Sequence, residues 1–430
     1  MKKTFLSFLI LILTICAFGE CYDEPRQRLD PDDFIIFPWG DKFSTEPNMN
    51  KYLQGLYDCG FNLTNHIDAK YVRYAHKYHL KAILDGGLIN WDIKDYKERA
   101  LDYTQKIIKE VGKDYLKDLY FVYVQDEPTM NENTKERLVA FSDAIKENIK
   151  CRPQINLFPT YATEEQLGTN NYDEYLDYFT KACKLDYISY DNYSISFNVK
   201  PNVPGITYTE TGAGFDENEF YGNLEAVRNA SIRNRVKFIN IIQSIGALHL
   251  PPPDDYIIHV QGWSTLAYGG RGLSYFTYTT GPGLGNNSEG PFDEYGMKSP
   301  TYRYVAHMNF AIHNIGAIYK NLKNINVYHI GNVPKGCKNE SSAINVKKLQ
   351  LHSIKGTPNV VVGEFLDRDK KQYAIIVNKD PKYSVAISIE FNKGDKIYKV
   401  EDRSIGAQVK PFGGEDTYIM PGHGVLLYAE

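Results

Sequence analysis

The stretch "YFVYVQDEPT", residues 120–129, decides how most of this chain is interpreted. Five of its first six residues are aromatic or β-branched, which is typical of a buried strand. The stretch then reaches two adjacent carboxylates, Asp126 and Glu127, and a proline, Pro128. A buried strand that ends in this way raises a question: the two acids either belong to a functional site or mark the place where the strand meets solvent.

The same alternation of apolar strands and amphipathic helices extends on both sides of this stretch, from residue 34 to about 325. We predict eight strands, over 33–40, 61–67, 80–87, 120–129, 153–160, 185–193, 237–245 and 271–280. Helices are predicted over 48–60, 70–79, 94–113, 131–149, 220–235, around 256–270 and over 301–324. This pattern predicts an α/β fold, a TIM (β/α)₈ barrel. A doubly wound sheet is the alternative, but the GxGxxG motif is missing after the first strand.

Residues 347–430 follow a different pattern, without a convincing helix. The segments "NVVVGEFLD", "QYAIIVNKD", "YSVAISIEF" and "HGVLLYAE" are predicted to be short antiparallel strands joined by polar turns. We therefore expect a small C-terminal β-sandwich domain. The predicted organisation is a signal peptide over 1–19, a barrel domain over 30–325 and the sandwich over 345–430.

The N-terminal segment has two lysines, an apolar run and small residues at Ala17 and Gly19, which is typical of a secretory signal peptide. We expect a secreted or periplasmic protein without an integral membrane span. A lipid anchor at Cys16 or Cys21 fits less well, because Ile15 and Glu20 precede them where a small residue is expected. The five cysteines left after cleavage are an odd number, and we interpret them as free, buried thiols.

The composition excludes some classes of function. The net charge of −4 and the absence of a basic stretch argue against nucleic-acid binding. The sequence has no HExxH, HxH, CxxC, GxSxG or phosphate-loop motif, so neither a metal nor another cofactor is predicted. The 34 Tyr and 21 Phe mostly fit core packing, although flat aromatic faces also suit sugar stacking. The oligomeric state is not predicted.

Active sites of (β/α)₈ barrels form at the C-terminal ends of the strands. In this sequence nearly every predicted strand ends in polar or aromatic residues, which predicts a ligand site at that face. These residues are Trp39, Asn65, His66, Asp85, Asp126, Glu127, Tyr161, Asp191, Asn192, Tyr193, Gln243 and Tyr278.

Carboxylates, amides and aromatic rings are the groups that cleave glycosidic bonds. One carboxylic acid protonates the leaving oxygen, and a second group attacks or stabilises the oxocarbenium-like centre. We predict Glu127 as the acid and a carbohydrate as the substrate. The second group stays open between Asp126, Asp191 and Asp85. The predicted substrate-binding residues are Trp39, Asn65, His66, Asp85, Tyr193, Gln243 and Tyr278.

"VQDEP" resembles the Asn-Glu-Pro acid/base motif of the retaining glycoside hydrolase barrels of clan A, with Asp126 in the place of the Asn. "DYISYDNY" and "QGWSTLAYGGRGLSYFTYTT" resemble stretches of β-galactosidase-like (family 42-like) bacterial barrels. The resemblance implies a glycosidase with Glu127 as acid/base. The sequence departs from that family at the seventh strand, where Gln243 stands in place of the nucleophilic Glu.

The Asp-Glu pair also resembles that of exo-N-acetylhexosaminidases, whose substrate supplies the attacking acetamido oxygen. That resemblance implies that Asp126 orients the acetamido group, with Tyr193 or Asp191 holding it. Neighbouring strand residues point to opposite faces, so Asp126 joins Glu127 only if the strand ends there, as Pro128 suggests. Otherwise Asp126 orients Glu127 or caps the next helix. A non-catalytic glycan-binding barrel is the alternative function.

Overall fold

The computed structural model describes residues 28–39, 46–86, 95–200, 209–246, 251, 253–280, 290–293, 297–401, 404–409 and 418–430. The predicted signal peptide, residues 1–19, lies outside these ranges. Across the ranges, none of the helices combines the length and the apolar character needed to cross a membrane.

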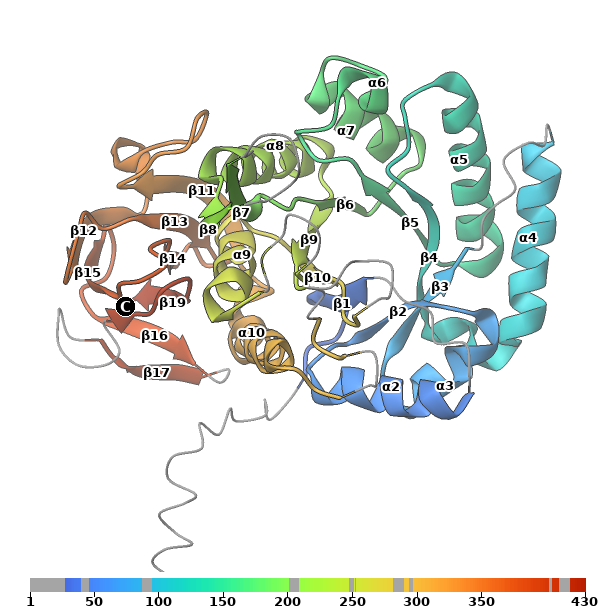
Figure 1. Ribbon diagram of the computed structural model, residues 1–430, viewed down its shortest axis with the longest axis horizontal. Helices are drawn as coiled ribbons and strands as arrows, with labels where there is room; N and C mark the ends of the chain where they lie inside the picture. The colour runs from blue at the N-terminus through green and yellow to red at the C-terminus, as the bar shows by residue number, and fades with distance from the viewer. Residues whose placement is uncertain are drawn as a thin grey trace, which may run out of the picture.

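Eight parallel strands form one sheet in the order β1-β10-β9-β6-β5-β4-β3-β2 (Figure 1). The strands are β1 (Ile35–Trp39), β2 (Leu63–Ile67), β3 (Lys81–Asp85), β4 (Leu119–Asp126), β5 (Arg152–Leu157), β6 (Tyr187–Asp191), β9 (Lys237–Gln243) and β10 (Gly272–Phe276). The two edges meet beside Asn62, whose backbone N–H donates to the Ile36 carbonyl at 3.1 Å and whose Oδ1 accepts from the Ile36 N–H at 2.8 Å. The sheet therefore closes into a barrel, which confirms the predicted fold class.

Helices surround the barrel strands (Figure 1). They are α2 (Glu46–Asp58), α3 (Val72–Lys77), α4 (Tyr96–Val111), α5 (Glu132–Ala144), α6 (Glu164–Leu167), α7 (Tyr172–Ala182), α8 (Glu217–Asn234), α9 (Asp255–Ala267) and α10 (Pro300–Tyr319). Several begin where the side chain of an N-cap residue accepts a backbone N–H, as Asn131 does for α5 and Asp254 for α9. Short 3₁₀ turns cover 69–71, 113–118 and 340–342, and a π-helical turn extends α5 over 145–149.

The interior of the barrel is filled by apolar side chains from alternate strand positions, which is how small barrels close without a channel. Members of this core include Phe37, Ile83, Phe121, Ile239 and Ile241. Toward the C-terminal strand ends the same core continues into three aromatic rings, those of Trp39, Tyr123 and Phe276. The floor of the barrel mouth is therefore aromatic.

Two antiparallel sheets follow the barrel and form the predicted sandwich. The larger has the order β11-β13-β14-β19-β16-β17 and the smaller β12-β15-β18. Their strands are β11 (Lys323–Ile330), β12 (Val346–Ser353), β13 (Val360–Leu366), β14 (Gln372–Asn378), β15 (Val385–Phe391), β16 (Ile397–Glu401), β17 (Ser404–Gln408), β18 (Tyr418–Ile419) and β19 (Gly424–Ala429). The four segments predicted as strands are confirmed as β13, β14, β15 and β19.

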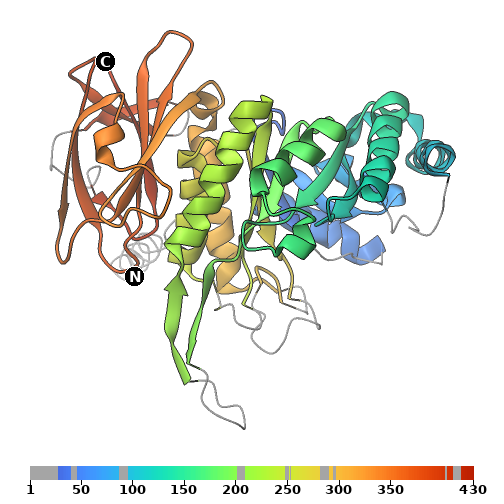
Figure 2. The ribbon, with the colours of Figure 1, turned by 90° about the horizontal axis from the view of Figure 1, so that it is seen from above.

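Several elements differ from the sequence prediction, among them α6 and α7, which were not predicted. The helix predicted over 301–324 ends at Tyr319, and Lys323–Ile330 forms β11 instead. Pairing with β13 in the six-stranded sheet satisfies the backbone of this segment, so tertiary contacts outweigh the local helical pattern. A hairpin of β7 (Ile195–Lys200) and β8 (Thr209–Phe215) was also not predicted. It projects from the barrel as a two-stranded ribbon (Figure 2).

The sandwich packs against α8, α9 and α10 (Figures 1 and 2). A buried ion pair joins Lys379 Nζ to Glu217 Oε2 at 2.6 Å, and the Tyr256 hydroxyl donates to the Lys379 carbonyl at 2.9 Å. The Tyr268 hydroxyl and His329 Nε2 are hydrogen-bonded at 2.9 Å. Helix α9 is buried along its length from Ile257 to Ala267, because it lies between the barrel and the sandwich.

The cysteine prediction is confirmed for the part of the chain that the structure describes. Cys59, Cys151 and Cys183 are buried free thiols, and Cys337 is a partly buried one. Cys21 lies outside the described residues.

The close approach of β13 to α9 depends on Gly363. A Cβ at this position would collide with the backbone carbonyl of Ala267, which cannot move without shifting the helix. We expect Gly363→Ala to lower the free energy of unfolding by about 1–3 kcal/mol. Gly222→Ala is the control: an added Cβ meets nothing within 4 Å on α8, and better helix propensity should stabilise by about 1 kcal/mol. Urea unfolding followed by circular dichroism measures both. An unchanged midpoint for Gly363→Ala contradicts the packing.

Candidate active site

Strand β4 ends at Asp126, and the chain turns sharply at the next residue. Glu127 has a φ of +43°, in the left-handed region that non-glycine residues rarely occupy. Its backbone N–H donates to the Asn156 carbonyl at 2.9 Å, which holds the turn. Because the strand has ended, the rule that neighbouring residues face opposite ways no longer separates the two acids. Backbone strain of this kind, costing on the order of 1 kcal/mol or more, is concentrated at functional sites.

The side-chain amide of Asn156 connects Asp126 to Asp191, which is the third acid of the site besides Glu127. Asn156, buried on β5, donates from Nδ2 to Asp126 Oδ1 at 3.0 Å and to Asp191 Oδ1 at 2.8 Å. The Ser189 hydroxyl donates to Asn156 Oδ1 at 3.1 Å, so the amide oxygen faces Ser189 and the amide nitrogen faces the carboxylates. The two carboxylate oxygens therefore lie within about 6 Å of each other, since both accept from one nitrogen.

The pKa values of Asp126, Glu127 and Asp191 are all shifted from their ordinary values. Burial and the neighbouring charge of Asp126 raise the pKa of Glu127 to about 7. Burial and the charge of Glu127 raise the pKa of Asp191 to about 7, against the opposing hydrogen bond from Asn156. Asp126 keeps an exposed surface, but loss of hydration inside the mouth also raises its pKa, while hydrogen bonds from Asn156 and Tyr123 act in the opposite direction. Three crowded carboxyls therefore retain a proton near neutral pH.

Aromatic rings surround these carboxyls. Trp39 contacts the rings of His66 and Tyr123 edge-on, with centroids 4.6 and 5.4 Å apart, and His66 stacks on Tyr123 at 4.1 Å. On the other side of the mouth Tyr193 packs against Phe276 at 5.1 Å. Such faces can bind the apolar faces of sugar rings while the acids contact the polar groups.

Two further predicted residues lie near the acids. The Tyr161 hydroxyl is hydrogen-bonded to the backbone of Tyr193, and Asp191 and Glu127 both act on it electrostatically. Asp85, partly exposed at the end of β3, acts electrostatically on the Tyr123 hydroxyl. Glu210 follows the sixth predicted strand in the sequence, and its side chain lies outside the described residues.

Most of the remaining predicted residues form hydrogen bonds with other parts of the protein. Gln243 is fully buried, and its amide nitrogen donates to the carbonyls of Ile245 at 3.3 Å and Pro251 at 2.9 Å. Tyr278 is buried and donates to the Gly55 carbonyl at 3.0 Å. Asn65 is fully buried on β2, and Asn192 donates to Asn223 Oδ1 at 2.9 Å. These contacts serve the fold, and substrate contacts by Gln243, Tyr278 and Asn65 stay predictions.

Sequence reasoning missed Asn156, Tyr123 and Phe276. Asn156 gave a usable signal, since it is a polar residue inside the apolar run "PQINLFPT", one strand away from the acids. Tyr123 and Phe276 gave none, because aromatic residues within strands are ordinary core residues.

One cluster within the described residues has the composition of a metal site, and it lies outside the barrel mouth. It consists of Asp255 and His259 on α9, His307 on α10 and His423 before β19. Burial and the neighbouring His259 and His423 lower the pKa of His307 to about 3, so this imidazole is neutral at neutral pH.

The sequence matches no protein-family model, and no curated protein is detectably similar to it. Among solved structures, a candidate α-galactosidase/melibiase from Bacteroides fragilis is 11% identical over 93% of this chain and 79% of that chain, with a TM-score of 0.49. A candidate α-L-fucosidase from Bacteroides thetaiotaomicron is 12% identical over 68% and 99%, with a TM-score of 0.45. The endo-β-1,4-mannanase from Thermotoga petrophila is 11% identical over 80% and 94%, with a TM-score of 0.40. The function proposed below rests on the residues of the site.

The raised pKa of Glu127 predicts a pH-dependent stability. Between its ordinary pKa of 4.5 and about 7, the folded chain binds a proton that the unfolded chain has lost. The free energy of unfolding attributable to Glu127 therefore falls as the pH rises through this window. We expect Glu127→Gln to be more stable than the wild type at pH 8 by about 1–2 kcal/mol and nearly equal to it at pH 4.

Urea unfolding at both pH values measures this effect. Glu132→Gln, which removes an exposed carboxylate on α5, is the control and should change little at either pH. The same stability difference at pH 4 and pH 8 for Glu127→Gln contradicts the raised pKa.

Proposed function

We propose that this protein is a glycoside hydrolase in which Glu127 is the general acid. The observation that carries the proposal is the strained, proton-retaining Glu127 beside the Asn156-bridged acids at the C-terminal strand ends of a barrel. A carboxylic acid with a pKa near 7 is still protonated when it meets substrate, and can give its proton to the departing glycosidic oxygen.

Asp191 is the best supported second carboxylate. It is buried, its Oδ1 accepts a hydrogen bond from Asn156, and the charge of Glu127 acts on it. When it loses its proton it can attack the anomeric carbon or activate a water there. Asp85, the other carboxylate considered for this role, acts electrostatically on the Tyr123 hydroxyl.

Asp126 serves to position its neighbours in this scheme. It accepts from Asn156 and from the Tyr123 hydroxyl, so its charge is held at the edge of the mouth. With an N-acetylated substrate, Asp126 would instead orient the acetamido group that attacks in place of a protein carboxylate. The substrate screen described below separates the two modes.

The aromatic rings at the barrel mouth, those of Trp39, Tyr123, Tyr193 and Phe276, favour a carbohydrate substrate. Sugar rings have flat apolar faces that stack on such side chains, and hydroxyl groups that need polar partners. Together with the predicted signal peptide, this supports an exported enzyme that acts on oligosaccharides, polysaccharides or glycans.

One observation favours a second function, a glycan-binding barrel without catalysis. Strand β9 ends in Gln243, where the clan A resemblance calls for a nucleophilic Glu, and its amide is bound to backbone carbonyls. An amide in this place cannot attack an anomeric carbon. Binding of sugars by the aromatic rings at the barrel mouth does not need a nucleophile on β9.

Hydrolysis of a panel of nitrophenyl and natural glycosides, including N-acetylated ones, separates the two functions. We expect at least one class to be cleaved and Glu127→Gln to lower kcat by about 10²–10⁴-fold. The loss should be greater for alkyl leaving groups than for nitrophenolate, which departs without a proton. The control Glu132→Gln should keep full activity. Sugar binding with no cleavage of any class by the wild type contradicts the hydrolase proposal and supports the binding function.

The pH profile of the wild type gives a further test. Because Glu127 acts in its protonated form, kcat/KM should fall on the alkaline side with an apparent pKa of about 7. The value belongs to the coupled carboxyls and not to Glu127 alone. A profile that stays level up to pH 9 excludes Glu127 as the acid.

A further inference from the structure

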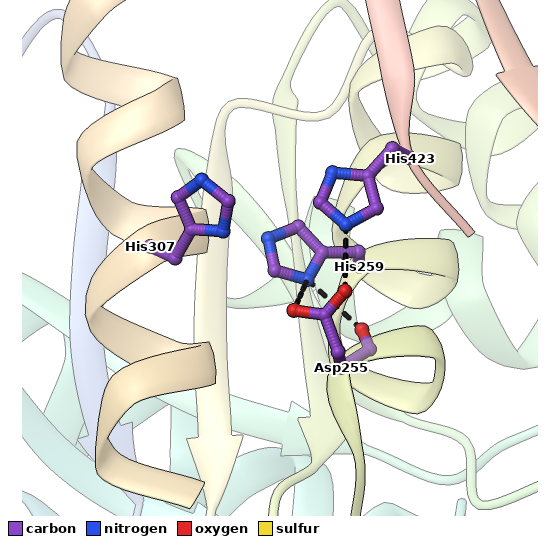
Figure 3. Close-up of side chains that lie close together, drawn as sticks. All are labelled: Asp255, His259, His307 and His423. Carbon is purple, nitrogen blue, oxygen red and sulfur yellow. Dashed lines mark hydrogen bonds and ion pairs between the residues drawn. The ribbon is translucent and has the colours of Figure 1, made fainter. Parts of the chain in front are cut away.

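Four potential metal ligands from three distant segments meet between the barrel and the sandwich. Asp255 and His259 lie one helical turn apart on α9, His307 comes from α10, and His423 comes from the turn between β18 and β19 (Figure 3). One ligand atom from each residue lies within 4.8 Å of every other. None of these residues belongs to the proposed active site.

The contacts within this cluster leave a buried ring nitrogen of His259 unsatisfied. His423 Nε2 lies 2.7 Å from Asp255 Oδ2, and His259 Nδ1 contacts both the Asp255 carbonyl at 2.9 Å and Asp255 Oδ1 at 3.3 Å. His259 is fully buried, and its Nε2 has no hydrogen-bond partner. Figure 3 shows this nitrogen pointing toward the ring of His307. A buried polar atom without a partner is costly, and a metal ion is one of the groups that satisfies it.

We propose that Asp255, His259, His307 and His423 bind one Zn²⁺ ion that fastens the sandwich to the barrel. Three imidazole nitrogens and one carboxylate oxygen form a donor set that suits Zn²⁺. Ca²⁺ and Mg²⁺ prefer oxygen ligands throughout. Four protein ligands fill a tetrahedral Zn²⁺, which is the arrangement of structural sites and not of catalytic ones.

The spacing of the ligands is close to what such a site requires. Ligand atoms around a tetrahedral Zn²⁺ are separated by about 3.4 Å, since each bond is about 2.0–2.2 Å. Contraction from the observed spacing of at most 4.8 Å needs side-chain movements of about 1 Å. Rotation of the imidazole and carboxylate side chains supplies movements of this size without any change in the backbone.

The backbone on both sides of His423 packs closely against α9. Gly422 has a φ of +76°, and a Cβ there would lie 2.8 Å from the Tyr256 carbonyl. On the other side of His423, a Cβ at Gly424 would lie 2.7 Å from the ring of Trp263. Both glycines therefore press the turn against α9, and the histidine between them is carried to Asp255 and His259.

An ion can reach the cluster from outside. His259, His307 and His423 line a cavity of about 560 Å³ between α9, α10 and the sandwich, with Lys399 and Glu401 in its wall. Lys399 is paired with Glu401, so its charge is largely compensated. Arg303 is the other nearby cation, acting on His307 from the same helix. Asp255 therefore supplies the net negative charge among the proposed ligands.

A hydrogen-bonded network without metal is the competing interpretation, because Asp255 contacts His259 and His423 directly. Such a network would not need His307 within reach, nor an unsatisfied nitrogen on His259. Metal content separates the two interpretations without any measurement of enzymatic activity.

The experiment uses the full chain, purified without a histidine tag, stripped with a chelator and then dialysed against Zn²⁺. We expect one Zn²⁺ per chain by mass spectrometry of metals. His307→Gln and His423→Gln should each weaken Zn²⁺ binding at least tenfold. His352→Gln is the matched control, because His352 is an exposed histidine on β12, and should bind as the wild type does.

Thermal unfolding provides the second measurement, which also detects variants that fail to fold. Zn²⁺ should raise the Tm of the wild type and the control by several degrees, because it binds the folded state. The Tm of His307→Gln should not respond. Two results would overturn the proposal. One is a content of less than 0.1 Zn²⁺ per chain at about 100 μM free Zn²⁺. The other is a Tm of the folded wild type that changes with neither Zn²⁺ nor chelator.

Discussion

The amide of Asn156 is the interaction on which the proposed chemistry depends. It bridges Asp126 and Asp191 while the Asn156 carbonyl accepts from the backbone of Glu127. One residue on β5 thus fixes the positions of all three acids. Burial raises the pKa of each acid, and repulsion from a neighbouring acid adds to the rise at Glu127 and Asp191, so a proton remains available near neutral pH. The same bridge opposes part of this rise, because its hydrogen bonds favour the charged forms of Asp126 and Asp191.

The barrel makes this bridge possible. In a closed parallel sheet all strands end at one face, so residues far apart in sequence, such as Asp126 and Asp191, meet there. The aromatic rings of Trp39, Tyr123 and Phe276 continue the barrel core toward the same face. The sandwich lies on the side of α8, α9 and α10 and contributes none of the acids. The proposed Zn²⁺ site therefore concerns the stability of the assembly, and it can fail without consequence for the proposed active site.

Much of the fold could be predicted from periodicity, because each barrel strand carries its own apolar run and each helix its own spacing. β11 could not, since its conformation is set by pairing with β13 and not by its local pattern. Strand ends also pointed to Asp126, Glu127, Asp191 and Tyr193, whose roles stay predictions. They could not reveal that Gln243 is tied to backbone carbonyls, because burial at a strand end depends on the loop that covers it.

The three histidines of the proposed Zn²⁺ site could not be predicted as a group either. They come from α9, α10 and the β18–β19 turn, and only the Asp255–His259 spacing of four is local. The sequence pattern therefore shows only the pair Asp255 and His259. Tertiary packing brings His307 and His423 to that pair.

The protonation of Glu127 in the folded protein is the central claim, and a carbon NMR titration of glutamate side chains tests it most directly. The Glu127 resonance is assigned by its loss in Glu127→Gln. An apparent pKa of about 7 for that resonance agrees with the account, since burial and Asp126 oppose ionisation. A value at the ordinary 4.5 contradicts it, because Glu127 would then be a carboxylate at neutral pH with no proton to give.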